Sequence, residues 1–504
     1  MTSTILRASL SALLFTGLAV SSPANVALPS IFSDHAVLQK TDKVPVWGNA
    51  DANEKVTVTI DKVTASTTTG ADGKWKVELD LKNEGAGPYQ LVVQGADKLT
   101  IQDVLIGEVW FCSGQSNMAF PLSAASTAKE EIPQSANSQL REFQAVLVAS
   151  PDPQDDNKGK WLISSPQTAG GFTAVGYYFG KKLQNELKTP IGLVHSSMGG
   201  SPIETWIRAE ALDTDPDLKQ GKEKSLLTPF TPTTNQNPFP ASYYFNGMIH
   251  PFLSYAIAGV IWYQGESNQE RGFQYRISFP LLINDWRKQW GQGDFPFYYC
   301  QLANRGNRLP QPGNNNRSEL CESQTLALSL PNTGQAVLID IGEEKETHFR
   351  NKKEAGERLA LIALAKTYGK QVIYSGPMYD SMQIEGDKIR IKLKFTDGGL
   401  VAKPLPATYQ PLSASPETKP LVRNSPNSML EGFSICGEDK KWHWADAKID
   451  RNDVIVWSDE IKNPIAVRYA WEANPICNLS NSSGLPACPF RTDNFPCMTE
   501  KARY

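Results

Sequence analysis

The chain has 504 residues, of which 40% are hydrophobic and 20% are charged, and its formal net charge is -3. These values are typical of a soluble globular protein, and the length predicts about three domains. The charges form no long run of one sign. We therefore expect no nucleic-acid partner, because binding to a phosphate backbone needs a concentrated basic face.

The N-terminus carries the pattern of an export signal. Arg7 precedes an apolar stretch over residues 10–20, and small residues follow up to Ala27. A charged start, a short apolar segment and a small-residue cleavage site are typical of a secretory signal peptide. We predict that residues 1–24 are removed and that the protein is secreted or periplasmic. No stretch is long enough to cross a bilayer, so we expect no membrane span.

Residues 25–103 are predicted to form a β domain. Alternating or β-branched runs occur at 43–48, 55–60, 75–81 and 89–93, and Gly, Asp and Asn separate them. Short strands at this spacing are typical of a β-sandwich.

Residues 104–370 show a different pattern, in which apolar strands alternate with helices. The strands are expected at 105–112, 191–194, 256–263, 295–299 and 336–341, and the helices at 173–187, 275–290 and 352–368. Strands that are apolar throughout are buried on both faces. The alternation therefore predicts a parallel sheet between two helical layers, a three-layer α/β domain.

Residues 371–504 again favour β structure. Strands are expected at 388–395, 454–457 and 466–471, and a loop-rich tail follows. We interpret this part as a second β-sandwich-like domain. Because export permits disulfides, we expect one bridge in the tail, between Cys477 and Cys488.

Sites in an open parallel sheet form at the carboxyl ends of its strands. The first apolar strand runs directly into Ser113-Gly114-Gln115-Ser116-Asn117-Met118. A tight glycine turn between strand and helix projects a hydroxyl at its tip and leaves backbone N–H groups beside it, which suits an acyl-transfer nucleophile. We predict Ser116 in that role, with Ser113 as the rival hydroxyl and a plain helix cap as the alternative.

Two later loops supply candidate oxyanion donors. Paired glycines follow the second strand, and glycine lets backbone N–H groups approach a ligand closely, so Gly200 is the first candidate and Gly199 the second. Gln264 follows the third strand, and its amide is a further candidate donor. We group Gln115, Asn117 and Glu266 as substrate-binding residues, and a supporting acceptor or a helix-terminal charge remains the alternative for Glu266.

Elimination identifies the candidate base. Four of the five histidines are poorly placed, two in the β regions, one at the end of an apolar strand and one before the amino end of a strand: His35, His443, His195 and His250. His348 follows the carboxyl end of a strand and precedes a helix, so we predict it as the general base.

The base needs a partner that fixes its tautomer and stabilises the imidazolium. Three carboxylates lie close by in sequence. Glu346 is the first choice, and Glu344 and Glu343 are the alternatives.

The segment Trp110 to Met118 resembles the sialate O-acetylesterase family of SGNH-type hydrolases. The likeness recurs in order along nearly the whole mature chain, at 37–39, 45–48, 191–206, 260–268, 330–334, 340–342 and 467–471. It implies a flavodoxin-like α/β catalytic domain flanked by β modules, with Ser116 as nucleophile and His348 as base. It also implies oxyanion donors at the Ser116 N–H, the Gly199-Gly200 loop and Gln264.

The chain departs from this family at two places. Relatives often read Asp-Ile-His-Pro where this chain reads Glu346-Thr347-His348-Phe349, and many carry the acid three residues before the histidine, where this chain has Lys345. The acid is therefore left open between Glu346, another carboxylate, and a Ser–His dyad helped by a backbone carbonyl. Met198 also replaces a frequent tryptophan, which alters the acyl pocket or the sugar platform.

These observations predict a serine esterase that removes O-acetyl groups from sugars, either sialic acids or acetylated polysaccharides. The reaction needs no metal and no organic cofactor. A catalytically inactive carbohydrate-binding protein and a lipase-like esterase of broader acyl range are the alternatives. The sequence specifies neither the sugar nor the oligomeric state.

Overall fold

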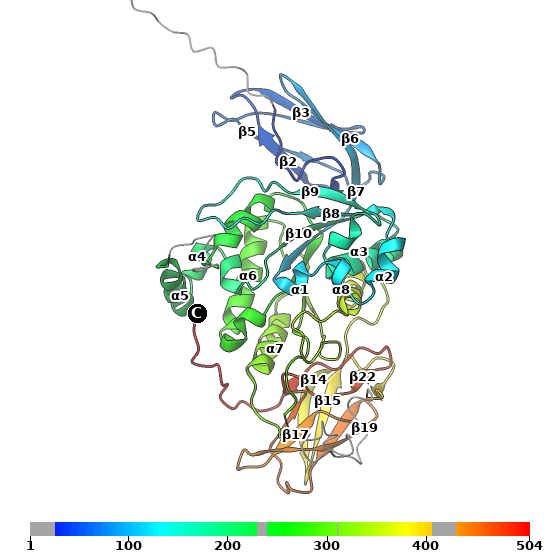
Figure 1. Cartoon of the computed structure of the whole chain (residues 1–504), viewed down its shortest axis with the longest axis vertical. Helices are drawn as coiled ribbons and strands as arrows, with labels where there is room; N and C mark the ends of the chain where they lie inside the picture. Colours follow the sequence, from blue (N-terminus) through cyan, green and yellow to red (C-terminus); the bar gives the residue numbers. More distant parts are fainter. Residues whose placement is uncertain (1–25, 229–238, 310, 406–429) are drawn as a thin grey trace, which may run out of the picture.

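The computed structural model describes residues 26–228, 239–309, 311–405 and 430–504. Figure 1 shows three parts stacked along the longest axis: an upper β region, a central sheet with helices, and a lower β region. The predicted signal peptide, residues 1–24, lies outside the described residues.

The central sheet carries its strands in the order β13-β12-β11-β7-β10-β8-β9. Their bounds are β7 Lys98–Gly114, β8 Asn137–Gln144, β9 Lys160–Ser164, β10 Ile191–Ser197, β11 Gly259–Tyr263, β12 Phe297–Cys300 and β13 Thr333–Ala336. Every neighbouring pair on this path is parallel except β8 with β9. The predicted α/β fold with a mostly parallel central sheet is confirmed.

Strand β7 joins the upper β region to the central sheet. Its first part pairs antiparallel with β6 (Tyr89–Gln94), its middle pairs parallel with β1 (Val37–Gln39), and its last residues pair with β10 and β11. The other strands of the upper region are β2 Val44–Asn49, β3 Lys55–Ile60, β4 Val63–Thr68 and β5 Lys74–Leu79. The upper region therefore sits at the amino end of the sheet and leaves the carboxyl edge free.

Helices cover both faces of the sheet. Trp110 of β7 packs against Phe179 of α3 (Ala174–Leu187), with ring centroids 5.0 Å apart, and the next residue, Phe111, packs 5.3 Å from Trp290 of α6 (Tyr275–Trp290). Consecutive strand residues point to opposite faces, so α3 and α6 lie on opposite sides. Helix α8 (Lys352–Lys366) packs beside α3. The remaining α-helices are α1 Ser116–Ala119, α2 Ala128–Glu131, α4 Ala209–Leu212, α5 Pro216–Leu226 and α7 Asn316–Leu326.

The lower region is built of β strands around its own buried core, so the predicted β structure in this part is confirmed. One sheet has the order β14-β15-β20-β19, another has the order β18-β17-β21-β23, and β16 pairs with β22. The bounds are β14 Met378–Glu385, β15 Lys388–Lys394, β16 Leu400–Ala402, β17 Phe433–Cys436, β18 Trp442–Trp444, β19 Asp446–Asp450, β20 Asp453–Trp457, β21 Ala466–Tyr469, β22 Leu479–Asn481 and β23 Phe490–Arg491.

Two predicted features of the sheet need correction. The strand expected at 336–341 is wrong, because β13 ends where it was expected to begin: Val337 and Ile339 pack into the lower core, whereas Leu338 packs into the main core. Strand β8 was not predicted, because Arg141 and Glu142 are buried within it and interrupt its apolar pattern.

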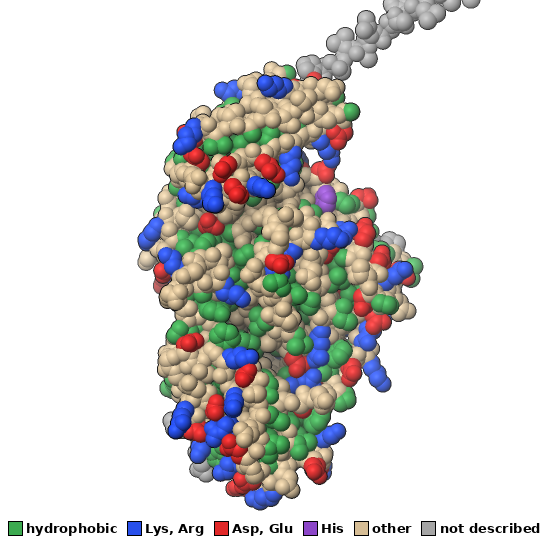
Figure 2. Space-filling model, turned by 180° about the vertical axis from the view of Figure 1, so that it is seen from behind, with side chains coloured by type: hydrophobic (Ala, Val, Ile, Leu, Met, Phe, Trp, Pro, Cys, Tyr) green, Lys and Arg blue, Asp and Glu red, His purple; other side chains and the backbone are tan. Residues whose placement is uncertain are grey.

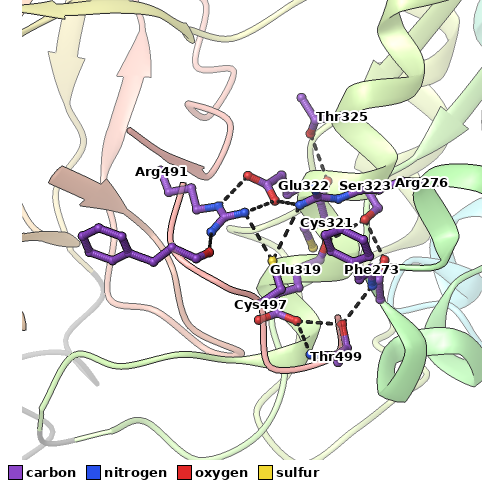
Figure 3. A network of polar contacts seen from close by, with 12 residues as sticks. Phe273, Arg276, Glu319, Cys321, Glu322, Ser323, Thr325, Arg491, Cys497 and Thr499 are labelled. Carbon is purple, nitrogen blue, oxygen red and sulfur yellow. Dashed lines mark hydrogen bonds and ion pairs between the residues drawn. The ribbon is translucent and has the colours of Figure 1, made fainter. Parts of the chain in front are cut away.

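The expected Cys477–Cys488 disulfide is also wrong, since all seven cysteines, each within the described residues, are free. Ion pairs and hydrogen bonds hold the C-terminal segment instead. Figure 3 shows the segment against α7, where Arg491 Nε donates to Glu322 (2.8 Å) and the backbone N–H and hydroxyl of Thr499 donate to Glu319 (3.0 and 2.7 Å).

The surface has no single-sign face in the view of Figure 2, where basic and acidic side chains are interspersed. This agrees with the formal net charge of -3. In the described ranges, no helix combines the length and hydrophobicity needed to cross a membrane.

Candidate active site

Strand β7 delivers the predicted nucleophile to the carboxyl edge of the sheet. It ends at Gly114, which has a φ of +135° and would place a Cβ atom 2.1 Å from the carbonyl oxygen of Tyr263, so only glycine fits there. The N–H of Gln115 donates to the same oxygen (2.9 Å), and α1 begins at the next residue. Ser116 is half-buried, whereas the rival Ser113 is fully buried. The hydroxyl at the rim is therefore that of Ser116.

The loop after β10 lies against this nucleophile. A Cβ atom on Gly199 would be 3.5 Å from the Cβ atom of Ser116. Gly200 follows with a φ of +76°, and its carbonyl accepts a hydrogen bond from Ser267 Oγ (2.8 Å). The structure thus brings the Gly199-Gly200 loop close to Ser116, and Gly199 is the nearer of the two glycines.

His348 lies on the loop before α8, at the same edge as Ser116. Its exposed ring is 6.4 Å, between centroids, from the ring of Phe120, which directly follows α1. The carbonyl of Thr347 accepts a hydrogen bond from Asn117 Nδ2 (3.2 Å). The loops carrying Ser116 and His348 therefore lie side by side. No hydrogen bond joins these two described side chains, so the pair is open.

The three candidate acids lie on the loop before His348, and none of these described carboxylates is hydrogen-bonded to its ring. Glu346 is exposed, and its backbone N–H donates to the carbonyl of Glu343 (3.3 Å). Glu343 accepts hydrogen bonds from Arg350. Partial burial raises the pKa of Glu343, but the Arg350 bonds outweigh it and leave the pKa below its usual value. The acid partner of His348 stays unassigned.

Gln264 does not match its predicted role as an oxyanion donor. Its side chain is fully buried, and Nε2 donates to Ser201 O (3.2 Å) and to Asn268 Oδ1 (2.7 Å). Its Oε1 accepts a hydrogen bond from the hydroxyl of Tyr275 (2.8 Å). Both amide hydrogens are used inside the protein, where Gln264 joins its own loop after β11 to Ser201 in the loop after β10.

Gln115 is better placed to meet a ligand. Its Oε1 accepts hydrogen bonds from the N–H groups of Gly265 (3.1 Å) and Ser267 (3.4 Å), which fixes the orientation of the amide. Its Nε2 has no hydrogen-bond partner among the described residues. The amide nitrogen of Gln115 is therefore a free donor beside Ser116.

Asn117 and Glu266, predicted to bind substrate, are instead tied to each other. Asn117 Nδ2 donates to Glu266 Oε1 (2.5 Å), and Asn117 Oδ1 accepts from Lys352 Nζ (2.5 Å). Sequence reasoning missed Lys352. The signal was present, because Lys352, Ala355 and Leu359 share one helical face, and a charged residue on a buried face needs a partner.

Residues 106–365 match the model of the carbohydrate esterase, sialic acid-specific acetylesterase family. The chain belongs to this family. The crystal structure of a carbohydrate acetylesterase from Xanthomonas citri is similar, with 37% identity and a TM-score of 0.80 over 94% of this chain and 100% of that one. The sialate O-acetylesterases of Mus musculus and Homo sapiens are 30% and 29% identical over 92% of this chain and 93% and 91% of theirs.

The enzyme is a carboxylic ester hydrolase, and the predicted activity on O-acetyl esters of sugars is confirmed by this family membership and these relatives. The matched residues run from β7 to α8 and contain the Ser116, Gly199-Gly200 and His348 loops.

The enzyme holds a second serine–histidine pair at this edge. His195 Nε2 lies 2.6 Å from Ser197 Oγ, and His195 Nδ1 lies 3.5 Å from Oε1 of the buried Glu142. Both residues stand on β10, and the N–H of Met198, which follows Ser197, already donates to Gly114 O (3.1 Å).

The lower β region supports the loop that carries His348. The N–H of Gly306 donates to Glu344 O (2.8 Å), and the carbonyl of Gly306 accepts from Asn474 Nδ2 (2.8 Å). The N–H of Arg305 donates to Ala473 O (2.8 Å). The loop at 304–306 therefore links the lower region to the catalytic edge.

Proposed function

We propose that the enzyme hydrolyses O-acetyl esters of sugars through an acetyl-serine intermediate on Ser116. In the first step His348 accepts the hydroxyl proton while Ser116 Oγ attacks the acetyl carbonyl carbon. The tetrahedral intermediate collapses, and the sugar oxygen leaves with the proton from His348. In the second step water gives a proton to His348 and attacks the acetyl carbonyl carbon. The second tetrahedral intermediate collapses, acetate leaves, and His348 returns the proton to Ser116 Oγ.

The negative charge of the tetrahedral oxygen needs N–H donors that are in place before the reaction. We propose the backbone N–H groups of Ser116 and of the Gly199-Gly200 loop for this role. The free amide nitrogen of Gln115 is proposed as a donor to the acyl or sugar oxygens. Gln264 is left out of the oxyanion hole, because both its amide hydrogens are used.

The convergence of three loops carries this proposal. Gly199 lies close to Ser116, and Asn117, the neighbour of Ser116, donates a hydrogen bond to the carbonyl of Thr347, next to His348. The His348 ring is exposed and free of hydrogen bonds among the described residues, so a side-chain rotation toward Ser116 Oγ breaks no hydrogen bond. We propose a Ser116–His348 pair to which the exposed Glu346 contributes little.

The sugar class is proposed to be either acetylated sialic acids or acetylated polysaccharides, because the family is described as sialic acid-specific and the similar crystal structure is that of a carbohydrate acetylesterase. Acetate release should be measured on acetylated sialic acids, xylans and xyloglucans, with the wild type and with Ser116→Ala. Release from one of these classes that disappears in the variant supports the proposal. Release that persists in Ser116→Ala contradicts the role of Ser116.

The finer organisation is also proposed: a flavodoxin-like SGNH domain over residues 104–370 between β domains at 25–103 and 371–504. The buried core of the lower region, separate from the main one, supports the second boundary. Export with cleavage after residue 24 is proposed from the sequence pattern alone. N-terminal sequencing of the secreted protein tests it, and a mature chain that still begins at Met1 would contradict it.

A further inference from the structure

Lys352 is buried directly beneath the nucleophile loop. It is the first residue of α8 and has no exposed surface. Three aromatic rings enclose its ammonium group, with Nζ 3.5 Å from the ring centroid of Phe349, 4.8 Å from that of Phe120 and 5.7 Å from that of Tyr263. Burying an ammonium group is costly unless it is paired, so a lysine kept here needs an explanation.

The ammonium group fixes the orientation of the Asn117 amide. Lys352 Nζ donates to Asn117 Oδ1 (2.5 Å), so the opposite amide orientation would set an NH₂ group against the ammonium. In the orientation observed, both amide hydrogens of Asn117 are used, one on Glu266 Oε1 (2.5 Å) and one on Thr347 O (3.2 Å). Lys352 therefore determines which side of Asn117 faces the carbonyl that precedes His348.

We propose that Lys352 is a positioning residue of the esterase site, which acts through Asn117 to hold the Thr347 carbonyl and so sets His348 relative to Ser116. This inference rests on the proposed function of Ser116 and His348. Ser116 adjoins Asn117 and His348 adjoins Thr347, so one amide connects the two loops that must meet for proton transfer. Glu266 completes the connection to the loop after β11.

The charge balance around Lys352 agrees with this role. Burial lowers the pKa of Lys352 to about 7, and the acidic groups that face it, Glu266, Cys300 and Glu343, offset part of the effect. Glu266 Oε2 is buried without a hydrogen-bond partner among the described atoms. Glu266 therefore has Asn117 as its hydrogen-bond partner, and the protonated form of the lysine is its neighbouring positive charge.

The test uses Lys352→Met in the full-length enzyme, with a chromogenic acetate ester. Methionine fills the aromatic cage without the charge or the donor. We expect kcat to fall about 30-fold, because a misplaced base loses alignment, while KM changes less than about 3-fold. Lys352→Arg keeps a charged donor and should recover most of the loss. Lys353→Met, at the exposed neighbouring position, is the matched control with wild-type kinetics.

A double-mutant cycle separates positioning from general damage to the fold. Asn117→Ala should also lower kcat about 30-fold, and the double variant Lys352→Met/Asn117→Ala should be little worse than either single change, since both break one connection. If Lys352→Met does not fold, Asn117→Ala with its unchanged lysine carries the test, and an unaltered kcat there overturns the proposal.

Two results contradict the inference: a folded Lys352→Met enzyme with unchanged kcat, and a double variant whose losses multiply. The outcome is separable from that of the proposed function. If Ser116→Ala is inactive while Lys352→Met is unaffected, only the positioning role fails. If Ser116→Ala remains active, the proposed function itself fails.

Discussion

Two serine–histidine pairs lie at the same edge of this sheet. One pair is hydrogen-bonded, but the backbone N–H that follows its serine is already used, whereas the other is not hydrogen-bonded but has a glycine loop beside its serine. Ser197 and His195 are already hydrogen-bonded, but they share one strand, and the N–H after Ser197 is used in the sheet. Ser116 and His348 are not bonded, but they come from different loops, and the glycine loop faces Ser116. A serine esterase needs donors for the oxyanion as well as a base, so the hydrogen-bonded Ser197–His195 pair is the less suitable one.

The largest expected effect separates the two serines. Ser116→Ala should lower kcat about 10,000-fold, because it removes the atom that forms the covalent bond. Ser197→Ala should keep kcat within about 3-fold, since it removes only a hydrogen bond to His195. Both rates are measured with a chromogenic acetate ester. A large loss in Ser197→Ala with a small one in Ser116→Ala would exchange the roles of the two pairs.

Substitution of the two histidines should affect different properties: His348 should affect kcat, and His195 should affect stability. His348→Gln should reduce kcat about 1,000-fold with little change in thermal stability, because the ring is exposed. His195→Gln should leave kcat nearly unchanged but lower the free energy of unfolding by about 1–3 kcal/mol, because the fully buried Glu142 loses its neighbour. Kinetics and denaturant unfolding of both variants provide the comparison.

Lys352 acts on the Ser116–His348 pair and not on the Ser197–His195 pair. It should also make the free energy of unfolding depend on pH. The pKa of Lys352 is lowered to about 7 by burial, against the facing groups Glu266, Cys300 and Glu343, and a lysine in the unfolded chain titrates near 10.4. Between these values the unfolded chain binds more protons, so this group's contribution to the free energy of unfolding rises with pH.

The free energy of unfolding, wild type minus Lys352→Met, should therefore increase from pH 7 to about pH 10 by a few kcal/mol. Below pH 7 the lysine is protonated in both the folded and the unfolded chain, so the difference should level off there. Urea unfolding at several pH values measures the difference. A difference that does not vary with pH would show that burial does not lower the pKa of Lys352 in the folded protein.

The smallest effect is expected at Glu346, the first candidate for the acid partner of His348. Glu346→Gln should change kcat less than about 3-fold, because the carboxylate is exposed and has no bond to His348. Glu343→Gln, which loses acceptor strength toward Arg350, serves as the comparison on the same loop. A loss of about 100-fold in Glu346→Gln would instead identify it as the triad acid.

The two loops of the open pair were not equally predictable from the sequence. The Ser116 loop follows from local rules, since an apolar strand, Gly114 and a helix start occur in consecutive residues. The position of His348 followed from elimination among the five histidines, from the family resemblance and from its place after an apolar segment, and that segment was wrong as a strand. Its residues Val337 and Ile339 pack into the lower core, which no local pattern indicates.

The polar parts of the site were the least predictable. Gln264 and Gln115 are the same residue type at two loop starts. Gln264 donates both amide hydrogens to other protein groups, whereas the amide nitrogen of Gln115 has no partner among the described residues. Which amide is free depends on Tyr275 and Asn268, whose side chains meet Gln264 only in the folded chain. Hydrogen-bond partners of buried groups are a property of tertiary structure, so sequence spacing does not reveal them.

The central claim is that acetyl transfer passes through Ser116, and trapping the acyl-enzyme tests it most directly. The enzyme is mixed with an activated acetate ester, quenched in acid within the first turnover, digested, and its peptides are mapped by mass spectrometry. We predict that the added acetyl group lies on Ser116 in the wild type and is absent in Ser116→Ala. An acetyl group on Ser197 or Ser113, or an active enzyme that never carries one, would contradict the account.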